Sequence, residues 1–281
     1  MTMRMVRARG GLTMPALGLG TWKMGDDPAR RKDEVAALRL GLELGMTLID
    51  TAEIYASGGA EEVTGEAVAG RRDSVFIVSK LHQTNASRDG TVRAAEASLK
   101  RMRTDWIDLY LLHNRGGPFP HEETLEALHR LKQAGKIRHF GLSNFDQADM
   151  ERSEAMPHGP EVAANQLRYS LARRSLDNGL RAWHAKHDIA VMAYTPLEEG
   201  FLKPQPGLAA VARRHGVSPI CIALAWTLRD PNVVTIPKAS NPTHVRENVR
   251  AIDIRLSVED LDALDRDYPR PPPGTFDIWT S

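Results

Sequence analysis

Short apolar segments alternate with longer amphipathic segments along nearly the whole chain, and this alternation restricts the possible folds more than any other feature. The short segments are rich in Val, Ile and Leu, which is typical of parallel strands covered on both faces. The expected strands are Leu17–Thr21, Thr47–Asp50, Val75–Ser79, Trp106–Leu112, Ile137–Leu142, Val162–Gln166, Ala190–Tyr194 and Val233–Ile236. The expected helices between them include Arg31–Leu44, Glu61–Ala69, Thr91–Arg101 and Glu122–Ala134. Eight repeated β-then-α units predict an α/β fold, a closed (β/α)8 TIM barrel.

Both ends of the chain fall outside this repeat. Val6–Met14 predicts a short N-terminal hairpin that turns at Gly10-Gly11. Val258–Arg266 predicts an extra C-terminal helix, followed by a proline-rich tail at Pro269–Gly274. Nothing along the 281 residues resembles a linker, so residues 1–281 are expected to form a single barrel domain.

Composition excludes several classes of partner. The formal net charge is only +1, which argues against nucleic acid or an anionic membrane as a partner. One cysteine, Cys221, excludes an internal disulfide and fits a reducing compartment. No apolar run approaches the ~20 residues that span a bilayer, and Met1–Gly10 lacks the apolar core of a secretory signal. We therefore expect a cytoplasmic protein whose partner is a small molecule.

Four residues suited to proton transfer stand at or just after the carboxyl ends of predicted strands, where the active sites of such barrels lie. They are Asp50, Tyr55, Lys80 and His113. Each alone has an ordinary structural explanation, such as a helix cap, a rim aromatic, a surface charge or a buried histidine. Together they match the parts that a proton donor near neutral pH requires.

The chemistry of these four residues assigns each a role. A phenol has an unperturbed pKa of about 10, so Lys80 beside Tyr55 is expected to lower the pKa of the tyrosine. Asp50 supplies the counter-charge that a buried ammonium needs. A neutral imidazole at His113 orients a substrate carbonyl next to the phenol. The sequence therefore predicts Tyr55 as general acid, with the other three in support.

The segments that carry these residues resemble the aldo-keto reductases. They are Asp50–Tyr55, Val78–Lys80 and Leu111–His113. Further segments match the family in the same order: Gly18–Trp22, Gly141–Phe145, Asn165-Gln166, Ala193–Leu197 and Ile236–Asn248. The resemblance covers almost the entire chain. It implies a monomeric carbonyl reductase with NADPH as the preferred cofactor and NADH as an alternative.

The resemblance also implies which residues contact the cofactor and the substrate. The implied cofactor contacts are Gly20, Thr21, Ser143, Asn144, Gln166, Tyr194, Thr195, Leu197, Lys238, Ser240, His244, Glu247 and Asn248. Among these, Tyr194 is the residue that stacks on the nicotinamide. The implied substrate pocket includes Trp22, His82 and Asn114.

Asn241-Pro242 adds a physical reason to expect an anion near the end of the barrel. An asparagine N-cap followed by proline begins a helix well, and the free amides at a helix N-terminus attract anions. Lys238 stands just upstream, and the resemblance implies that the anion is the 2′-phosphate of NADPH. His244 stands where many members have arginine, and histidine is the weaker, pH-dependent partner. Ala239 likewise replaces a common serine, so the strength of the NADPH preference stays open.

Some segments resemble bacterial methylglyoxal reductases in particular: Thr51–Glu53, Gly58–Glu62, Ile236–Asn248 and Tyr268-Pro269. This narrower resemblance implies small aldehydes and ketones as substrates, and dicarbonyls such as methylglyoxal among them. Asn114 replaces a tryptophan of many relatives, and the loop from Leu197 to Pro206 is short. Both departures predict an open pocket.

Other patterns fail on their spacing. Gly18-x-Gly20 has Lys23 where a dinucleotide fingerprint needs its third glycine, and His121-Glu122 has Leu125 in place of a second zinc-binding histidine. No metal is therefore expected. Two other functions stay open on the same fold: a cofactor-sensing subunit, and an aldolase or isomerase with Lys80 as Schiff-base nucleophile.

Overall fold

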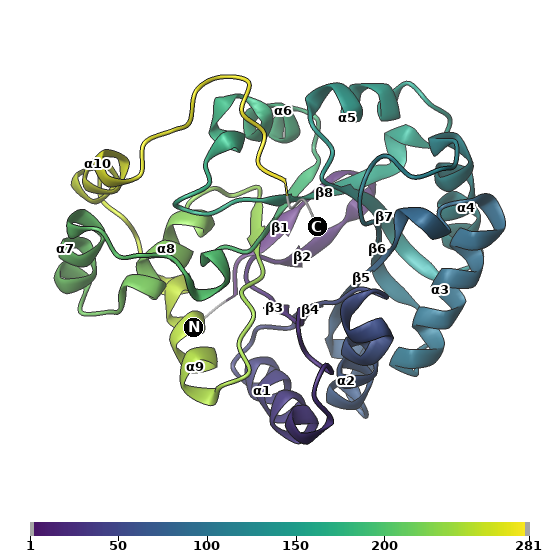
Figure 1. Cartoon of the computed structure of the whole chain (residues 1–281), viewed down its shortest axis with the longest axis horizontal. Coiled ribbons are helices and arrows are strands. Elements are labelled where there is room, and N and C mark those ends of the chain that lie inside the picture. The colour runs from purple at the N-terminus through teal and green to yellow at the C-terminus, as the bar shows by residue number, and fades with distance from the viewer. Residues whose placement is uncertain (1–2, 279–281) are drawn as a thin grey trace.

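Parallel strands surround the centre of the molecule in the computed structural model, which describes residues 3–278 (Figure 1). The eight strands are β3 (Leu19–Gly20), β4 (Leu48–Asp50), β5 (Phe76–Leu81), β6 (Ile107–Leu112), β7 (Ile137–Ser143), β8 (Val162–Arg168), β9 (Ala190–Tyr194) and β10 (Val233–Thr235). Each strand pairs in parallel with the next one along the chain. The parallel order matches the predicted fold.

The first and last strands meet and close the sheet into a barrel. The Gly18 amide donates to the Thr235 carbonyl at 2.9 Å, and the Thr235 amide donates to the Ala16 carbonyl at 2.8 Å. Gly20 pairs with Lys238 one step further along. A Cβ at Gly20 would lie 2.8 Å from the Ile236 carbonyl oxygen, so the close approach of these two segments requires glycine. The predicted (β/α)8 barrel is confirmed.

Helices form a layer around the outside of the strands (Figure 1). They are α1 (Arg31–Glu43), α2 (Gly59–Val68), α3 (Arg88–Met102), α4 (His121–Gln133), α5 (Gln147–Glu154), α6 (Leu180–Lys186), α7 (Pro206–His215), α8 (Pro219–Leu228), α9 (Pro242–Arg250) and α10 (Val258–Asp267). Gly45 and Gly135 follow α1 and α4 with φ of +91° and +70°, as expected of glycines that end helices. The buried apolar side chains of strands and helices together form the core.

The N-terminal hairpin lies at the amino-terminal ends of the barrel strands. Strand β1 (Met5–Arg7) pairs antiparallel with β2 (Thr13–Pro15). Arg9 joins the hairpin to the barrel, because its amide donates to the Asp188 carbonyl at 2.7 Å and its Nε donates to the Val162 carbonyl at 2.5 Å. The hairpin therefore covers the end of the barrel opposite the carboxyl ends of the strands.

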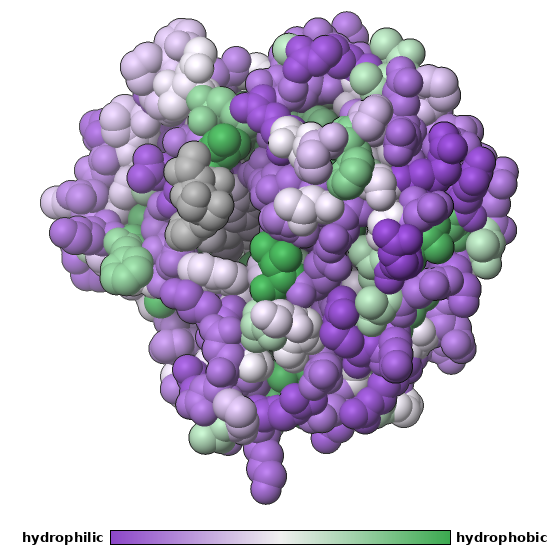
Figure 2. All heavy atoms as spheres, turned by 45° about the vertical axis from the view of Figure 1, so that its right-hand side comes forward, coloured by the Kyte–Doolittle hydropathy of each residue, from purple (hydrophilic) through white to green (hydrophobic). Residues whose placement is uncertain are grey.

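The surface is largely polar. Figure 2 shows hydrophilic side chains over most of the face that it presents. Within residues 3–278, no helix combines the length and the apolar character needed to cross a bilayer. Among the larger apolar side chains, Phe201 is 80% exposed and Ile54 is 45% exposed, and both line the cavity described next.

Candidate active site

A cavity of about 990 Å³ opens at the carboxyl-terminal ends of the barrel strands. The carboxyl-terminal ends of several strands supply its walls, together with the loops that follow β3 to β7, β9 and β10. It is lined by these residues of the sequence prediction: Gly20, Thr21, Trp22, Asp50, Tyr55, His82, His113, Asn114, Ser143, Asn144, Gln166, Tyr194, Thr195, Leu197, Lys238, Ser240 and His244. Lys80 is fully buried and contacts two of these lining residues, Asp50 and Tyr55.

Two predicted cofactor residues are not among those that line the cavity. Glu247 and Asn248 lie in the second half of α9, where Asn248 is buried and Glu247 half-buried. The Glu247 carbonyl accepts a hydrogen bond from Cys221 Sγ at 3.1 Å. The structure therefore places these two residues against the rest of the protein rather than on the cavity wall.

Lys80 of β5 links Asp50, at the end of the adjacent strand β4, to Tyr55. Its Nζ donates to Asp50 Oδ2 at 2.8 Å, to the Thr51 carbonyl at 2.8 Å and to Tyr55 Oη at 3.4 Å. Strands β4 and β5 pair in register, so Asp50 and Lys80 lie within reach of each other. The three polar partners satisfy the three donors of the ammonium, which makes its complete burial possible.

The pKa of Lys80 reflects this pairing. Burial alone lowers the pKa of the ammonium, but the Asp50 carboxylate and the Tyr55 phenol raise it more, so that the net pKa lies above 10.5. Lys80 is therefore a cation near neutral pH. An aldolase that uses Lys80 as a nucleophile would need the neutral amine, which this site disfavours.

The pKa of Tyr55 depends on its burial as well as on the two charged groups beside it. Burial raises the pKa of the phenol, Lys80 lowers it and Asp50 raises it, and the net pKa lies above 10. Lys80 therefore lowers the pKa of the phenol, as predicted, while burial and Asp50 raise it by more.

His113 lies next to Tyr55 in the lining of the cavity. The two ring centroids are 5.8 Å apart, with an interplanar angle of 75°. Burial holds the pKa of His113 well below 6.5, and the electrostatic effects of Lys80 and then of His82 lower it further. The imidazole is therefore neutral near pH 7, as the sequence predicts, and it can donate one hydrogen bond without carrying charge.

Residues at the carboxyl-terminal ends of β7, β8 and β9 form a polar wall of the cavity. Asn144 has a left-handed φ of +64°; its Nδ2 donates to Asn114 Oδ1 at 2.7 Å, and its Oδ1 accepts from the Tyr194 hydroxyl at 2.8 Å. Gln166 Nε2 donates to Asp50 Oδ1 at 2.7 Å. Asn165 points elsewhere, since its Nδ2 donates to the Phe145 carbonyl at 2.8 Å. This network fixes the amide groups that line the cavity.

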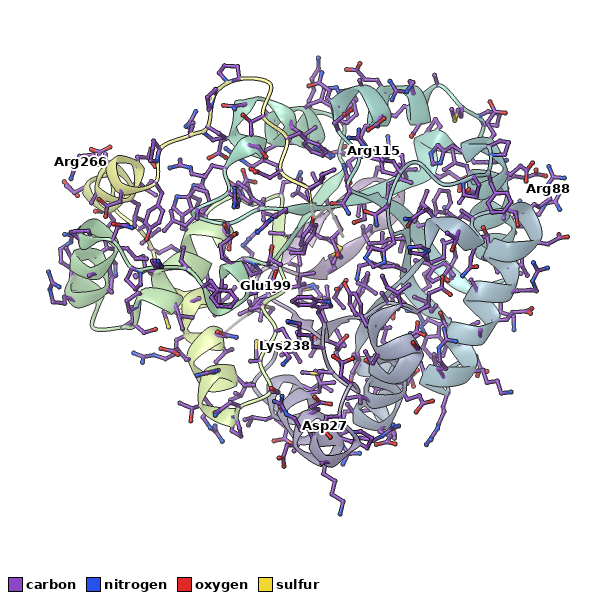
Figure 3. All side chains as sticks on the ribbon, viewed as in Figure 1. Asp27, Arg88, Arg115, Glu199, Lys238 and Arg266 are labelled. Atoms are coloured by element: carbon purple, nitrogen blue, oxygen red, sulfur yellow. The ribbon has the colours of Figure 1, made fainter. Side chains whose placement is uncertain are left out.

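A cationic corner lies where β10 leads into α9. Asn241 caps α9 by accepting a hydrogen bond from the Thr243 amide at 2.8 Å, and Pro242 occupies the first turn, as predicted. Lys238 Nζ donates to Ser240 Oγ at 3.2 Å. Figure 3 shows Lys238 near the middle of this face, with Glu199 of the neighbouring loop, which also lines the cavity.

Comparison with known proteins agrees with this geometry. The model of the aldo/keto reductase family matches residues 16–268. The chain belongs to the aldo/keto reductase family. It is therefore an oxidoreductase.

Individual relatives match over nearly their full lengths. Methylglyoxal reductase YeaE of Escherichia coli K12 is 44% identical over 277 residues, which cover 96% of this chain and 97% of the relative. Methylglyoxal reductase DkgB of Salmonella typhi is 32% identical, with 90% and 92% covered. The crystal structure of an aldo-keto reductase from Klebsiella pneumoniae in complex with NADPH has a TM-score of 0.95 and 44% identity, with 99% and 100% covered.

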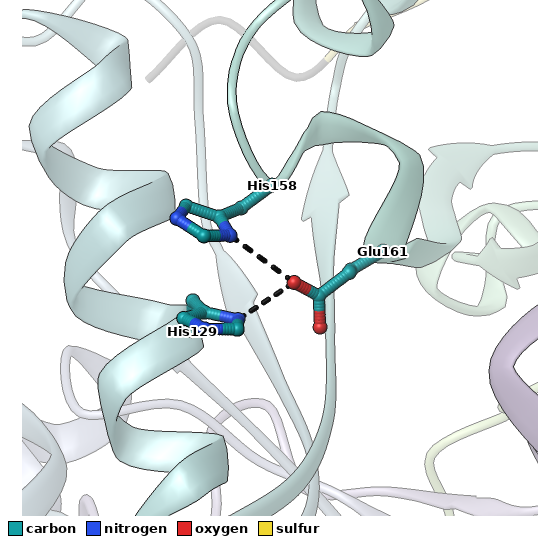
Figure 4. Close-up of side chains that lie close together, drawn as sticks. All are labelled: His129, His158 and Glu161. Atoms are coloured by element: carbon teal, nitrogen blue, oxygen red, sulfur yellow. Dashed lines mark hydrogen bonds and ion pairs between the residues drawn. The ribbon is translucent and has the colours of Figure 1, made fainter.

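One group outside the cavity of this aldo-keto reductase has the residue types of a metal site. His129, His158 and Glu161 bring their ligand atoms within 4.8 Å of one another. Figure 4 shows both Nδ1 atoms directed at one oxygen of Glu161, at 2.6 and 3.3 Å. Glu161 lies just before β8, at the end of the barrel away from the cavity.

The geometry of this group is that of an ion-pair cluster. The two imidazole rings are stacked with centroids 3.9 Å apart and an interplanar angle of 17°. A metal ion lies in the plane of each imidazole that binds it, so one ion cannot bind both stacked rings unless one ring turns. Lys132 also donates to the second oxygen of Glu161 at 2.8 Å and neutralises the carboxylate.

Proposed function

We propose that this aldo-keto reductase reduces small aldehydes and ketones, including dicarbonyls such as methylglyoxal, with NADPH as hydride donor and Tyr55 as proton donor. The observation that carries the proposal is the hydrogen bond from the buried Lys80 ammonium to the Tyr55 hydroxyl, at 3.4 Å. An ammonium in that position stabilises the phenolate that remains after the proton has left.

The residues of the cavity fit a nicotinamide dinucleotide. Thr195 Oγ1 is buried at the cavity wall without a hydrogen-bond partner among the described residues, so it is free to bind a ligand atom. Ser143, Asn144, Gln166 and Tyr194 form the wall proposed to hold the nicotinamide end. Lys238, Ser240 and His244 would hold the phosphate end. The bound cofactor supplies the hydride that reaches the carbonyl carbon.

The protein's own side chains carry out the proton transfer to the substrate. The Tyr55 hydroxyl donates its proton to the carbonyl oxygen as negative charge develops there. His113, neutral at pH 7, donates a hydrogen bond that holds this oxygen next to the phenol. Lys80 stays charged because Asp50 pairs with it at 2.8 Å. The proton is thus moved by a phenol whose conjugate base has a fixed cation beside it.

The substrate end of the cavity is partly polar, which favours small polar substrates. Trp22, His82 and Asn114 line it, and the exposed Phe201 and Ile54 also contribute. Asn114 is held by Asn144, so it presents a fixed polar group rather than an aromatic ring. The name of the E. coli relative, methylglyoxal reductase, supports a small dicarbonyl as substrate.

The test is the loss of nicotinamide absorbance with NADPH, and separately with NADH, against methylglyoxal and a panel of aldehydes and ketones. Tyr55→Phe should lower kcat by about 10² or more while leaving NADPH binding intact, because only the proton donor is lost. Near-normal turnover by this variant would contradict the role of Tyr55. Tight NADPH binding without turnover of any carbonyl would instead indicate a cofactor sensor.

A further inference from the structure

Two cations from distant parts of the chain meet at one hydroxyl in the corner where α9 begins. Arg30 Nη2 donates to Ser240 Oγ at 3.0 Å, and Lys238 Nζ donates to the same oxygen at 3.2 Å. A serine oxygen has two lone pairs, so both are used and the hydroxyl proton is left to be donated elsewhere. The corner therefore presents two positive groups and one free hydroxyl donor.

The two cations of this corner have no direct carboxylate partner: among residues 3–278, neither Arg30 nor Lys238 forms an ion pair. Burial lowers the pKa of Lys238, and Arg30 lowers it further; Glu34 opposes this, Lys23 adds to it and Asp26 opposes it. Lys238 is half-buried and Arg30 is exposed, and two cations held on one hydroxyl are expected where an anion joins them.

The backbone holds Arg30 where its side chain reaches this corner. Asp27 accepts a hydrogen bond from the Ala29 amide at 2.9 Å and begins a 3-10 turn, Pro28–Arg30, that leads directly into α1. Helix α1 packs beside α9, as Figure 1 shows. Arg30 lines the same cavity as Tyr55, together with Lys238, Ser240 and His244.

We propose that Arg30 binds the 2′-phosphate of the cofactor and is the main source of discrimination for NADPH over NADH in this chain. The inference rests on the proposed cofactor and assigns a residue that lies outside the Ile236–Asn248 segment. Arg30 makes up for His244, which is exposed and is not fixed by any hydrogen bond among those found within residues 3–278.

Physical chemistry favours Arg30 over His244 in this role. A guanidinium is charged at every working pH and presents parallel donors that match two phosphate oxygens. An imidazole has an unperturbed pKa near 6.5 and offers at most one donor toward a given anion. With Lys238 and the Ser240 hydroxyl, Arg30 completes a set of donors around one dianion, next to the N-terminus of α9.

The test measures binding of two fragments of the cofactor, so it does not depend on turnover. Adenosine 2′,5′-bisphosphate and 5′-AMP differ by the 2′-phosphate alone, and calorimetry gives the affinity of each. Arg30→Gln should weaken the bisphosphate about 10- to 100-fold and leave 5′-AMP within about twofold, the range for a lost hydrogen-bonded charge. Arg30→Lys should recover part of the loss, because it keeps the charge but not the fork.

Lys32→Gln is the matched control, since Lys32 is an exposed cation two residues away in α1 with no contact to Ser240. His244→Gln should have a smaller effect than Arg30→Gln. The proposal is overturned if Arg30→Gln behaves like Lys32→Gln, or if it weakens both fragments equally. A wild-type protein that binds both fragments alike overturns it too, and removes the NADPH preference; carbonyl reduction with NADH would then survive on its own.

Discussion

Lys80 and Asp50 form an ion pair at the cavity wall, with Nζ and Oδ2 2.8 Å apart and side chains 0% and 4% exposed. Asp50 Oδ1 also accepts from Gln166 Nε2 at 2.7 Å, so both oxygens of the carboxylate are used. The pair thus links the proposed proton donor, through Lys80, to the wall proposed to hold the nicotinamide.

The first prediction concerns the loss of this carboxylate. Asp50→Asn leaves the Lys80 ammonium buried without a counter-charge, which costs about 3–5 kcal/mol for a broken buried pair. Lys80 then loses charge more readily, so both kcat and the free energy of unfolding should fall. Steady-state kinetics and urea unfolding at pH 7 measure the two effects. A variant with wild-type stability would show that the ammonium finds another partner.

The second prediction isolates Lys80 from overall stability. Lys80→Met replaces the ammonium with an apolar side chain of similar length, so no unpaired charge remains in the core. The Tyr55 pKa should rise further because the largest influence that lowers it is lost. We expect kcat to fall by about 10² or more at pH 7 with little change in NADPH affinity. Fluorescence titration with NADPH separates the two quantities, and equal losses in both would argue for a purely structural role.

The third prediction concerns His113 and pH. The pKa of His113 lies well below 6.5 because the ring is buried and Lys80 is nearby. The neutral ring, which is the form proposed to orient the carbonyl, is therefore retained as pH falls from 8 to 6. The profile of kcat/KM over this range should have no acid limb caused by His113, and His113→Gln should lower kcat/KM without changing the profile's shape. An acid limb near pH 6.5 that disappears in His113→Gln would contradict this.

The strand ends of the barrel explain why much of the site could be predicted from the sequence. In a parallel (β/α)8 barrel, residues at or just after the carboxyl ends of the strands lie at the same end of the barrel, so Asp50, Lys80 and His113 converge whatever the details of packing. Tyr55 follows by proximity in the loop after β4. These positions depend only on topology, which the alternation of segments determines.

What the sequence did not predict depends on side-chain geometry and burial. Arg30 belongs to no recognisable motif, and its contact with Ser240 exists because a 3-10 turn brings the start of α1 beside α9. The direction of the Tyr55 pKa shift depends on whether the effect of burial exceeds that of the Lys80 ammonium. The spacing of residues in the sequence does not give the size of either effect. Glu247 and Asn248 lie in the second half of α9 and do not line the cavity, so their predicted contact with the cofactor stays a prediction.

The last prediction concerns stability at acid pH and a histidine outside the cavity. His184 is fully buried in α6; its Nδ1 contacts the Leu180 carbonyl at 2.7 Å and its Nε2 contacts Asn165 Nδ2 at 3.0 Å. The tautomer with hydrogen on Nδ1 satisfies both contacts, and burial lowers the pKa of the ring to about 4. The unfolded chain, with a histidine pKa near 6.5, therefore binds more protons between pH 4 and 6.5.

The stability contributed by neutral His184 is complete above pH 6.5 and is lost as the pH falls toward 4. A difference of about 2.5 pKa units corresponds to roughly 3 kcal/mol. Urea unfolding of wild type and His184→Gln at several pH values between 4.5 and 7 tests this. The variant should be less stable at pH 7, because two buried contacts are altered, yet should lose less stability on acidification. Burial also lowers the pKa of His121 to about 4, so part of the dependence of stability on pH remains in both proteins. If the two proteins lose stability in parallel, His184 is not a source of the pH dependence.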